Sequence, residues 1–275
     1  MTTDASQAPG DLPKQQADAN ADSRGEIAIE ATGVAKRFGH LEALRGASLT
    51  VHNGEIVALV GDNGAGKTTF ANILCGALHP DEGTLAYWGQ PVEVQSIGHA
   101  HELGVGVVYQ NLSLALDLSV TDNLYLGREQ RRPGWRSWFG LLDRPRMREE
   151  GRAALARLGI KLRAMNVPVR NLSGGQRQAL AVARAMLWAR RAILMDEPTA
   201  ALGPKQTGIV FETVRRAADD GLAVLVISHD IPRMLTVADR IAVMRHGVVV
   251  AVRPAAALHM NDVIGLMLGV EAPAA

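Results

Sequence analysis

The sequence predicts an α/β fold, in which a mixed sheet is flanked by helices and carries an antiparallel β subdomain and an inserted α-helical subdomain. Two observations lead to this prediction. Four short runs of Val, Ile, Leu and Ala are nearly continuous, as in central parallel strands that are covered on both faces. Helical patterns separate these runs, as crossovers between parallel strands require. The runs are 56–60, 105–109, 192–195 and 223–227.

A glycine-rich stretch of the form G-x-x-x-x-G-K-T follows the first run and opens a helical pattern over 67–78. Its residues are Gly61, Asp62, Asn63, Gly64, Ala65, Gly66, Lys67 and Thr68, with Thr69 next. Glycines let backbone N–H groups converge on phosphate oxygens, and the helix start adds partial positive charge. Lys67 would reach the outer phosphates, and the Thr68 hydroxyl would bind Mg²⁺.

The alternative to this interpretation is a structural glycine turn before a helix. The strand before the stretch and the helix after it both favour the phosphate-binding loop. The sequence therefore predicts a nucleoside triphosphate site on a P-loop NTPase core.

Bulk composition narrows the class of protein. The 275 residues allow one large domain, with or without an insert, and a net charge of +1 gives no field that would attract nucleic acid or a membrane surface. The single cysteine, Cys75, excludes an internal disulfide framework, and we expect it to be a small buried residue. No apolar run approaches the roughly 18 residues that cross a bilayer.

We expect three further regions along the chain. Residues 1–25 hold almost no large apolar residues and should form a disordered tail before a folded domain over 26–270. Alternating apolar residues from 27 to 51 predict antiparallel strands, with turns at 53–54 and 81–83 and a further strand over 84–88. Two short strands near 241–244 and 248–252 and a helix over 261–268 close the domain.

The strand signal disappears between about 111 and 189, where helical patterns predict the inserted subdomain. Helices over 176–189 and 206–219 are also expected. The insert is rich in arginine and has few acidic residues. A solvated helical face explains this composition, and a surface for a partner or lipid headgroups is the alternative. Its arginines between 128 and 170 are Arg128, Arg131, Arg132, Arg136, Arg144, Arg146, Arg148, Arg152, Arg157, Arg163 and Arg170.

Two carboxylates end the run 192–195 and complement a phosphate-binding loop. Asp196 would hold Mg²⁺, directly or through water, while Thr68 supplies another oxygen ligand. Glu197 would orient or deprotonate an attacking water. Upstream of this strand, Ser173 is an expected N-cap, and the glycines after it expose N–H groups at a second helix start. The motif comprises Leu172, Ser173, Gly174, Gly175 and Gln176.

This L-S-G-G-Q motif, upstream of the acidic strand, resembles the signature of ATP-binding cassette (ABC) ATPases, and the resemblance covers residues 26–269. It implies an ATPase whose hydrolysis is coupled to transport. Three further roles follow from it. Phe38 would stack on adenine, Gln110 would contact Mg²⁺ or water, and His229 would contact the γ-phosphate. All of these roles are carried over from the family's motifs.

In this family the signature of one cassette closes over ATP bound to the phosphate loop of another. The resemblance therefore implies that Ser173 to Gln176 contact a partner's nucleotide, and that the chain forms a homodimer or pairs with a homologue. One position departs from the family. Gly203 stands where the family usually has aspartate, and this change bears on coordination between the two sites rather than on ATP binding.

Residues 108–114 and 123–129 resemble importers of ribose, xylose and fructose, with L-G-R-E at 126–129 the most specific part. This resemblance implies transmembrane permease subunits, an extracytoplasmic sugar-binding protein and a peripheral location on the cytoplasmic face of the inner membrane. Use with an exporter is one alternative. A ribosome-acting cassette would carry two tandem cassettes and a chromosome or DNA-repair cassette a long coiled coil, and neither pattern occurs here.

Overall fold

The computed structural model describes residues 25–108, 114–132, 140–157, 159–160, 162, 164–199 and 202–270. Most of the expected tail, and Gln110, therefore lie outside the described residues.

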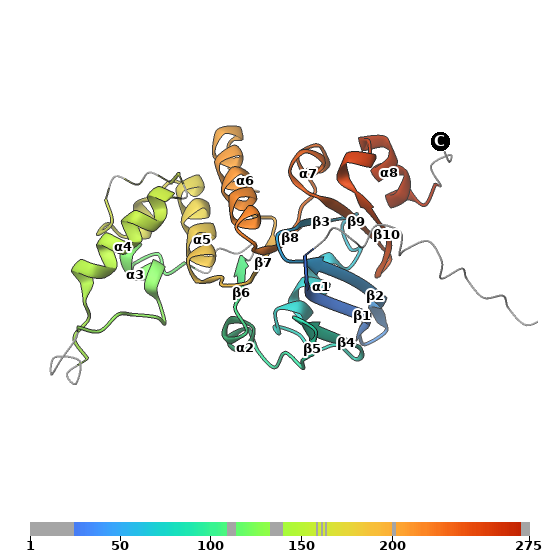
Figure 1. The fold of residues 1–275 in the computed structure, drawn as a ribbon, viewed down its shortest axis with the longest axis horizontal. Helices are drawn as coiled ribbons and strands as arrows, with labels where there is room; N and C mark the ends of the chain where they lie inside the picture. Colours follow the sequence, from blue (N-terminus) through green and yellow to red (C-terminus); the bar gives the residue numbers. More distant parts are fainter. Residues whose placement is uncertain are drawn as a thin grey trace, which may run out of the picture.

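A six-stranded mixed sheet forms the centre of the molecule, in the order β10-β9-β3-β8-β7-β6 (Figure 1). All neighbours pair in parallel except β10, which is antiparallel to β9. The strands β3, β7 and β8 are buried along their whole length, which explains their continuous apolar sequence. The strands are β3 (Ile56–Val60), β6 (Val105–Val108), β7 (Ala192–Asp196), β8 (Ala223–Ile227), β9 (Arg240–Arg245) and β10 (Val248–Pro254).

The two faces of this sheet belong to two separate hydrophobic clusters. Val57 and Leu59 of β3 point to one face, and Ile56, Ala58 and Val60 point to the other, because side chains alternate along a strand. The first face packs on α1 (Lys67–Leu74) and on the antiparallel sheet. That sheet has the order β2-β1-β4-β5 and comprises β1 (Ile27–Phe38), β2 (Leu41–His52), β4 (Glu82–Tyr87) and β5 (Gln90–Pro91).

The second face packs on helices that come later in the chain. They are α5 (Gly174–Trp188), α6 (Pro204–Asp219), α7 (Ile231–Val237) and α8 (Met260–Leu268). Between β5 and β6 lies the short helix α2 (Ile97–Glu102), whose Ala100 belongs to the cluster of the first face.

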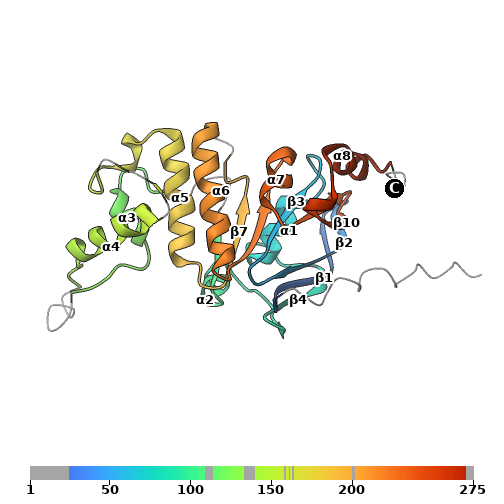
Figure 2. The same cartoon turned by 45° about the horizontal axis from the view of Figure 1, so that its top comes forward.

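Every described element between β6 and β7 is helical, apart from two isolated bridges. The elements are α3 (Val120–Tyr125), α4 (Arg144–Arg157), the 3₁₀ turn Val169–Asn171 and α5. They share a third cluster around Leu124, Met147 and Leu180. Figure 2 shows α3 and α4 at the end of the molecule opposite to α8. On α4, Arg146 is 63 % exposed and pairs with Glu150 at 2.8 Å, as expected of a solvated helical face.

Three local expectations differ from the structure. The helix α1 ends at Leu74 instead of residue 78, because Gly76 adopts a left-handed conformation (φ 73°) against Val94 and Ser96. The strand β4 begins at Glu82, so only the bend at Asp81 remains of the turn predicted over 81–83. The turn at 53–54 exists, but it leads from the antiparallel sheet into β3 of the central sheet.

A buried ion pair lies at the edge of the sheet where β3 begins. Glu55 and Arg240 are each 7 % exposed, and Arg240 Nη2 donates to Glu55 Oε2 at 2.7 Å and to the Thr50 carbonyl at 2.7 Å. Burial alone would raise the pKa of Glu55, but the hydrogen bond and charge of Arg240 hold that pKa below its ordinary value. Arg240 thereby joins β9 to β2 and β3.

We predict that Arg240→Met destabilises the protein by about 3–5 kcal/mol, because it leaves the Glu55 carboxylate buried without its cation. Chemical unfolding at neutral pH measures this loss. Arg37→Met is the matched control, since Arg37 and Glu42 form an exposed pair at 3.1 Å and its removal should cost less than about 1 kcal/mol. Equal losses in the two variants would contradict the prediction.

Candidate functional site

The phosphate-binding loop connects β3 to α1 at the carboxyl edge of the central sheet. Gly66 precedes α1 with φ 104°, and a Cβ at this position would lie 2.6 Å from the Ala43 carbonyl oxygen. Both observations require glycine. The loop therefore has the strand–turn–helix geometry that its sequence predicts.

Lys67 lies across this loop. Its ammonium donates to the carbonyls of Gly61 at 2.8 Å and Asp62 at 2.9 Å. Burial lowers the pKa of Lys67, while the carboxylates of Glu197 and Asp196 act in the opposite direction. A cation held by two carbonyls is a hydrogen-bond donor that can turn toward an anion in the loop.

Asp196 ends β7 and faces the start of α1. It is 9 % exposed, and burial raises its pKa, while a hydrogen bond from the Thr68 hydroxyl and the charge of Lys67 lower it less. Thr69 follows Thr68 in the same turn of α1. A hydroxyl oxygen beside a carboxylate is the donor set that Mg²⁺ prefers. The described residues contain no cluster of three or more His, Cys, Asp or Glu that could hold a metal ion.

Glu197 and His229 contact each other. Glu197 adopts φ 49°, which is rare for a residue with a side chain, and its amide donates to the Ile227 carbonyl at 3.0 Å. His229 Nδ1 lies 2.8 Å from Glu197 Oε1, with the imidazole 74 % and the carboxylate 15 % exposed. Sequence reasoning predicted both residues for the site but not this hydrogen bond, since it depends on the neighbouring positions of β7 and β8.

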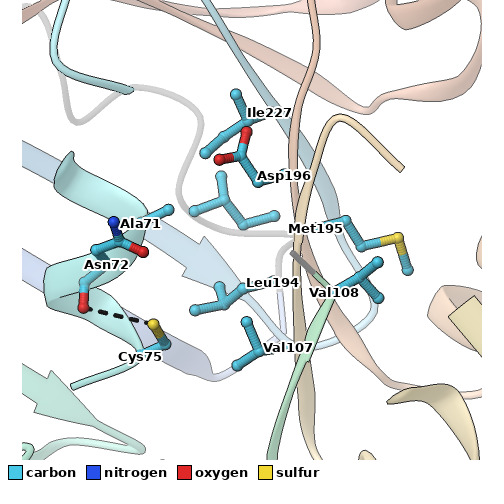
Figure 3. A pocket seen from close by; sticks show the side chains of 10 residues that line it. Ala71, Asn72, Cys75, Val107, Val108, Leu194, Met195, Asp196 and Ile227 are labelled. Atoms are coloured by element: carbon cyan, nitrogen blue, oxygen red, sulfur yellow. Dashed lines mark hydrogen bonds between the residues drawn. The ribbon is translucent and has the colours of Figure 1, made fainter. Parts of the chain in front are cut away.

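A small apolar hollow lies beneath the Asp196 carboxylate, between α1 and the strands β6, β7 and β8 (Figure 3). Val107 and Leu194 line it, with Asp196 at its rim. Cys75 is 1 % exposed, and its thiol donates to the Asn72 carbonyl at 3.4 Å. The expectation of a buried structural cysteine is confirmed. The hollow explains the raised pKa of Asp196, because few polar groups solvate the carboxylate from below.

The second predicted helix start, at Ser173, has a complete capping box. The Ser173 hydroxyl accepts from the Gln176 amide at 3.2 Å, and the Ser173 amide donates to Gln176 Oε1 at 3.0 Å. Gly174 and Gly175 form the first turn of α5, and a Cβ at Gly174 would meet no atom within 4 Å. Since α5 and α1 pack on opposite faces of the sheet, this helix start and the phosphate loop are separate features of one chain.

Phe38 and Gln110 are two other expected site residues. Phe38 ends β1, and the Lys36 ammonium lies over its ring, 5.9 Å from the centroid. The side chain is nevertheless 46 % exposed, so part of the ring is accessible to a planar ligand. Gln110 belongs to residues that the structure does not describe, and the described strand before it ends at Val108. Gly203 precedes α6 without a side-chain cap, where aspartate would be a good N-cap.

We predict that Asp196→Asn stabilises the protein without bound nucleotide at neutral pH, because burial raises the pKa of Asp196. A raised pKa means that the folded state disfavours the ionised carboxylate, so the gain should be present above the folded pKa. It should vanish as the pH falls through the ordinary value of 3.8. Thermal unfolding between pH 3 and 8 measures it, and Asp220→Asn at an exposed position is the control. A pH-independent difference would contradict the prediction.

A strand–loop–helix together with a second strand of the same sheet that ends in a carboxylate, one strand removed from the first, defines the class of phosphate-binding loop proteins. Comparison with known families is more specific. The family model described as "ABC transporter" matches residues 44–200. Residues of this chain are also 42 % identical, over 90 % of the chain and 96 % of the relative, to the fructose import ATP-binding protein FrcA of Rhizobium meliloti.

Two further relatives are similar. The ribose import ATP-binding protein RbsA 1 of Burkholderia thailandensis is 42 % identical over 86 % of this chain, which spans only 46 % of that relative. The xylose/arabinose import ATP-binding protein XylG of Sulfolobus acidocaldarius is 42 % identical over 81 % of this chain and 86 % of its own length. The chain thus spans nearly all of the fructose relative and about half of the ribose relative.

Solved structures agree with these relatives. A nucleotide-free ATP-binding cassette from an ABC transporter superposes with a TM-score of 0.73 at 25 % identity, covering 88 % of this chain and 95 % of the other. A dimeric bacterial ABC transporter cassette gives 0.72 at 25 % identity, covering 84 % and 100 %. The chain belongs to the ATP-binding cassette family of transporter ATPases. None of its described helices is long and apolar enough to cross a membrane.

Proposed function

We propose that this chain is the ATP-hydrolysing subunit of an importer that takes up a simple sugar through a separate permease. The similarity to the fructose import protein over almost the whole of both chains carries this proposal. The proximity of Lys67, Thr68 and Asp196 supports it, because hydrolysis needs a phosphate site and a metal site side by side.

At the phosphate end, the backbone from Gly61 to Gly66 would hold the phosphate groups. The Lys67 ammonium would leave its two carbonyl partners and bind the negatively charged phosphates instead. Thr68 and Asp196 would hold Mg²⁺, with Gln110 as a further ligand. The bound ion would neutralise charge on the outer phosphates. The donor set fits this ion, since both described groups offer oxygen. At the other end, Phe38 would stack on the base, as its exposed face allows.

Glu197 would take the proton of the attacking water as general base. Its hydrogen bond to His229 at 2.8 Å would hold the carboxylate in one orientation, and the exposed imidazole would remain able to contact the outer phosphate. The left-handed backbone of Glu197 supports this assignment, because strained residues are concentrated at functional sites. Asp196 and Glu197 would thus have different roles, one for metal and one for water.

The chain would work as a homodimer or with a homologous second cassette. The helix α5, which begins after Ser173, and the helix α1, which follows the phosphate loop, pack on opposite faces of one sheet. The L-S-G-G-Q motif that covers the bound ATP is therefore more easily supplied by a partner. The similarity to a dimeric cassette supports this arrangement. Ser173, Gly174, Gly175 and Gln176 would then contact the partner's nucleotide. ATP would hold the dimer closed and hydrolysis would open it.

The dimer would bind transmembrane permease subunits at the cytoplasmic face of the membrane, as a peripheral subunit. An extracytoplasmic sugar-binding protein would deliver the sugar to the permease. Residues 26–270 would form the cassette domain, and 111–189 its helical subdomain. Gly203 would loosen coordination between the two ATP sites, because it lacks the carboxylate that the family usually has at this position.

Proteoliposomes that hold the chain with its co-purifying permease and binding protein test this function. D-fructose, D-ribose and D-xylose, added one at a time, should differ in how strongly they stimulate ATP hydrolysis, and one of them should accumulate in the transport direction. ATP turnover that is indifferent to every sugar would contradict the import proposal.

We predict that Glu197→Gln lowers ATP turnover by about a hundred- to ten-thousandfold, which is the usual contribution of a general base. Since the amide still fits the site, ATP should remain bound and a closed dimer should accumulate, as light scattering with ATP and Mg²⁺ would reveal. Glu212→Gln, on the exposed side of α6, is the matched control. Unchanged turnover in Glu197→Gln would exclude the proposed role.

We predict that Lys67→Ala weakens ATP binding by at least about tenfold, because it removes the cation of the phosphate loop. Equilibrium binding of a fluorescent ATP analogue measures the loss. Arg216→Ala removes an exposed cation on α6 and should leave the affinity unchanged. Normal affinity and normal turnover in Lys67→Ala would place the nucleotide elsewhere.

A further inference from the structure

The turn between β9 and β10 is hydrogen-bonded to the phosphate loop through Gly247. Its amide donates to the Ala65 carbonyl at 2.9 Å, and its carbonyl accepts from the Arg45 amide of β2 at 2.9 Å. Gly247 therefore joins the loop, the central sheet and the antiparallel sheet through backbone hydrogen bonds alone.

No side chain fits at this junction. Gly247 has φ 79°, and a Cβ there would lie 2.8 Å from the Ala43 carbonyl oxygen and 3.0 Å from Leu44 Cα. Both are backbone atoms of β2, which cannot rotate away as a side chain would. The strand β9 approaches the other end of the loop just as closely, since a Cβ at Gly61 would lie 2.2 Å from the Met244 carbonyl oxygen.

The bond to Ala65 determines the direction of a phosphate-binding group. The Ala65 carbonyl and the Gly66 amide belong to one peptide unit, which is planar and trans, so C=O and N–H point in opposite directions. Because Gly247 holds this carbonyl toward the β9–β10 turn, the Gly66 N–H points away from that turn. Backbone N–H groups with this orientation are what a phosphate-binding loop uses to bind its anion.

We propose that Gly247 is a positioning residue of the ATP site, which fixes the Ala65–Gly66 peptide so that its N–H faces the phosphates. The proposal rests on the function proposed above. Through Arg45 the same residue connects the loop to β2, which pairs with β1 at Phe38. The turn would thus fix the position of the phosphate-binding loop relative to Phe38, the residue that we propose binds the base.

Gly247→Ala tests the proposal against Gly89→Ala. Gly89 has a similar φ of 73°, but an added Cβ there would have no atom within 4 Å. The control variant therefore has the same backbone strain and displaces no neighbouring atom. We expect Gly247→Ala to raise the KM for ATP about ten- to a hundredfold, as loop displacements of this kind do. The kcat should change less, because the lost contact is made in ground state and transition state alike. Equal KM values in the two variants would overturn the proposal.

Hydrogen exchange in the unmodified protein provides a second test, which does not depend on the folding of a variant. Addition of ATP with Mg²⁺ should slow exchange at the amides of Gly247 and Arg45, because a ligand that holds the loop also closes their hydrogen bonds. The Gly221 amide, in a turn away from the loop, should not change. Bound ATP without slower exchange at Gly247 would overturn this inference alone, whereas absence of ATP binding would overturn the proposed function.

Discussion

The parallel pairing of β3, β8 and β7 is the constraint on which the site depends. In this register Leu59 lies beside Ile227, and Ile227 lies beside Asp196, so the three strands end at the same edge of the sheet. The phosphate loop and His229 follow β3 and β8 within two residues, and Asp196 is the last residue of β7, directly before Glu197. A shift of one strand by a residue would separate them and would also turn the buried side chains to the other face.

Two buried carboxylates, one at each edge of the sheet, have pKa values that are shifted in opposite directions. At the amino edge Glu55 has Arg240 as a full counter-ion, and its pKa is lowered. At the carboxyl edge Asp196 has a neutral hydroxyl as its hydrogen-bond partner and lies above an apolar hollow, and its pKa is raised. The first carboxylate stabilises the fold. The negative charge of Asp196 is only partly compensated, which lowers the stability of the fold but leaves the carboxylate able to bind a cation.

Much of this architecture could be predicted from the sequence. The four buried runs are strands of the central sheet, and Ser173 is an N-cap, because continuous burial and local capping leave direct signals. The ends of elements were less predictable. The helix α1 is shorter than its pattern, since Gly76 packs against residues that follow much later in the chain. The helices α2 and α7 were not predicted, because six or seven residues give too little periodicity.

The sequence by itself determined the chemistry of this protein: a glycine loop with Lys67 and Thr68, two carboxylates after a strand, and the L-S-G-G-Q helix start. These are local patterns, whose meaning depends on residues a few positions apart. Only the tertiary structure decided that Glu197 bonds to His229, that α1 and α5 cover opposite faces, and that Gly247 supports the loop. Each of these contacts joins segments that are distant in the chain, so strand order and register determine them rather than any local pattern.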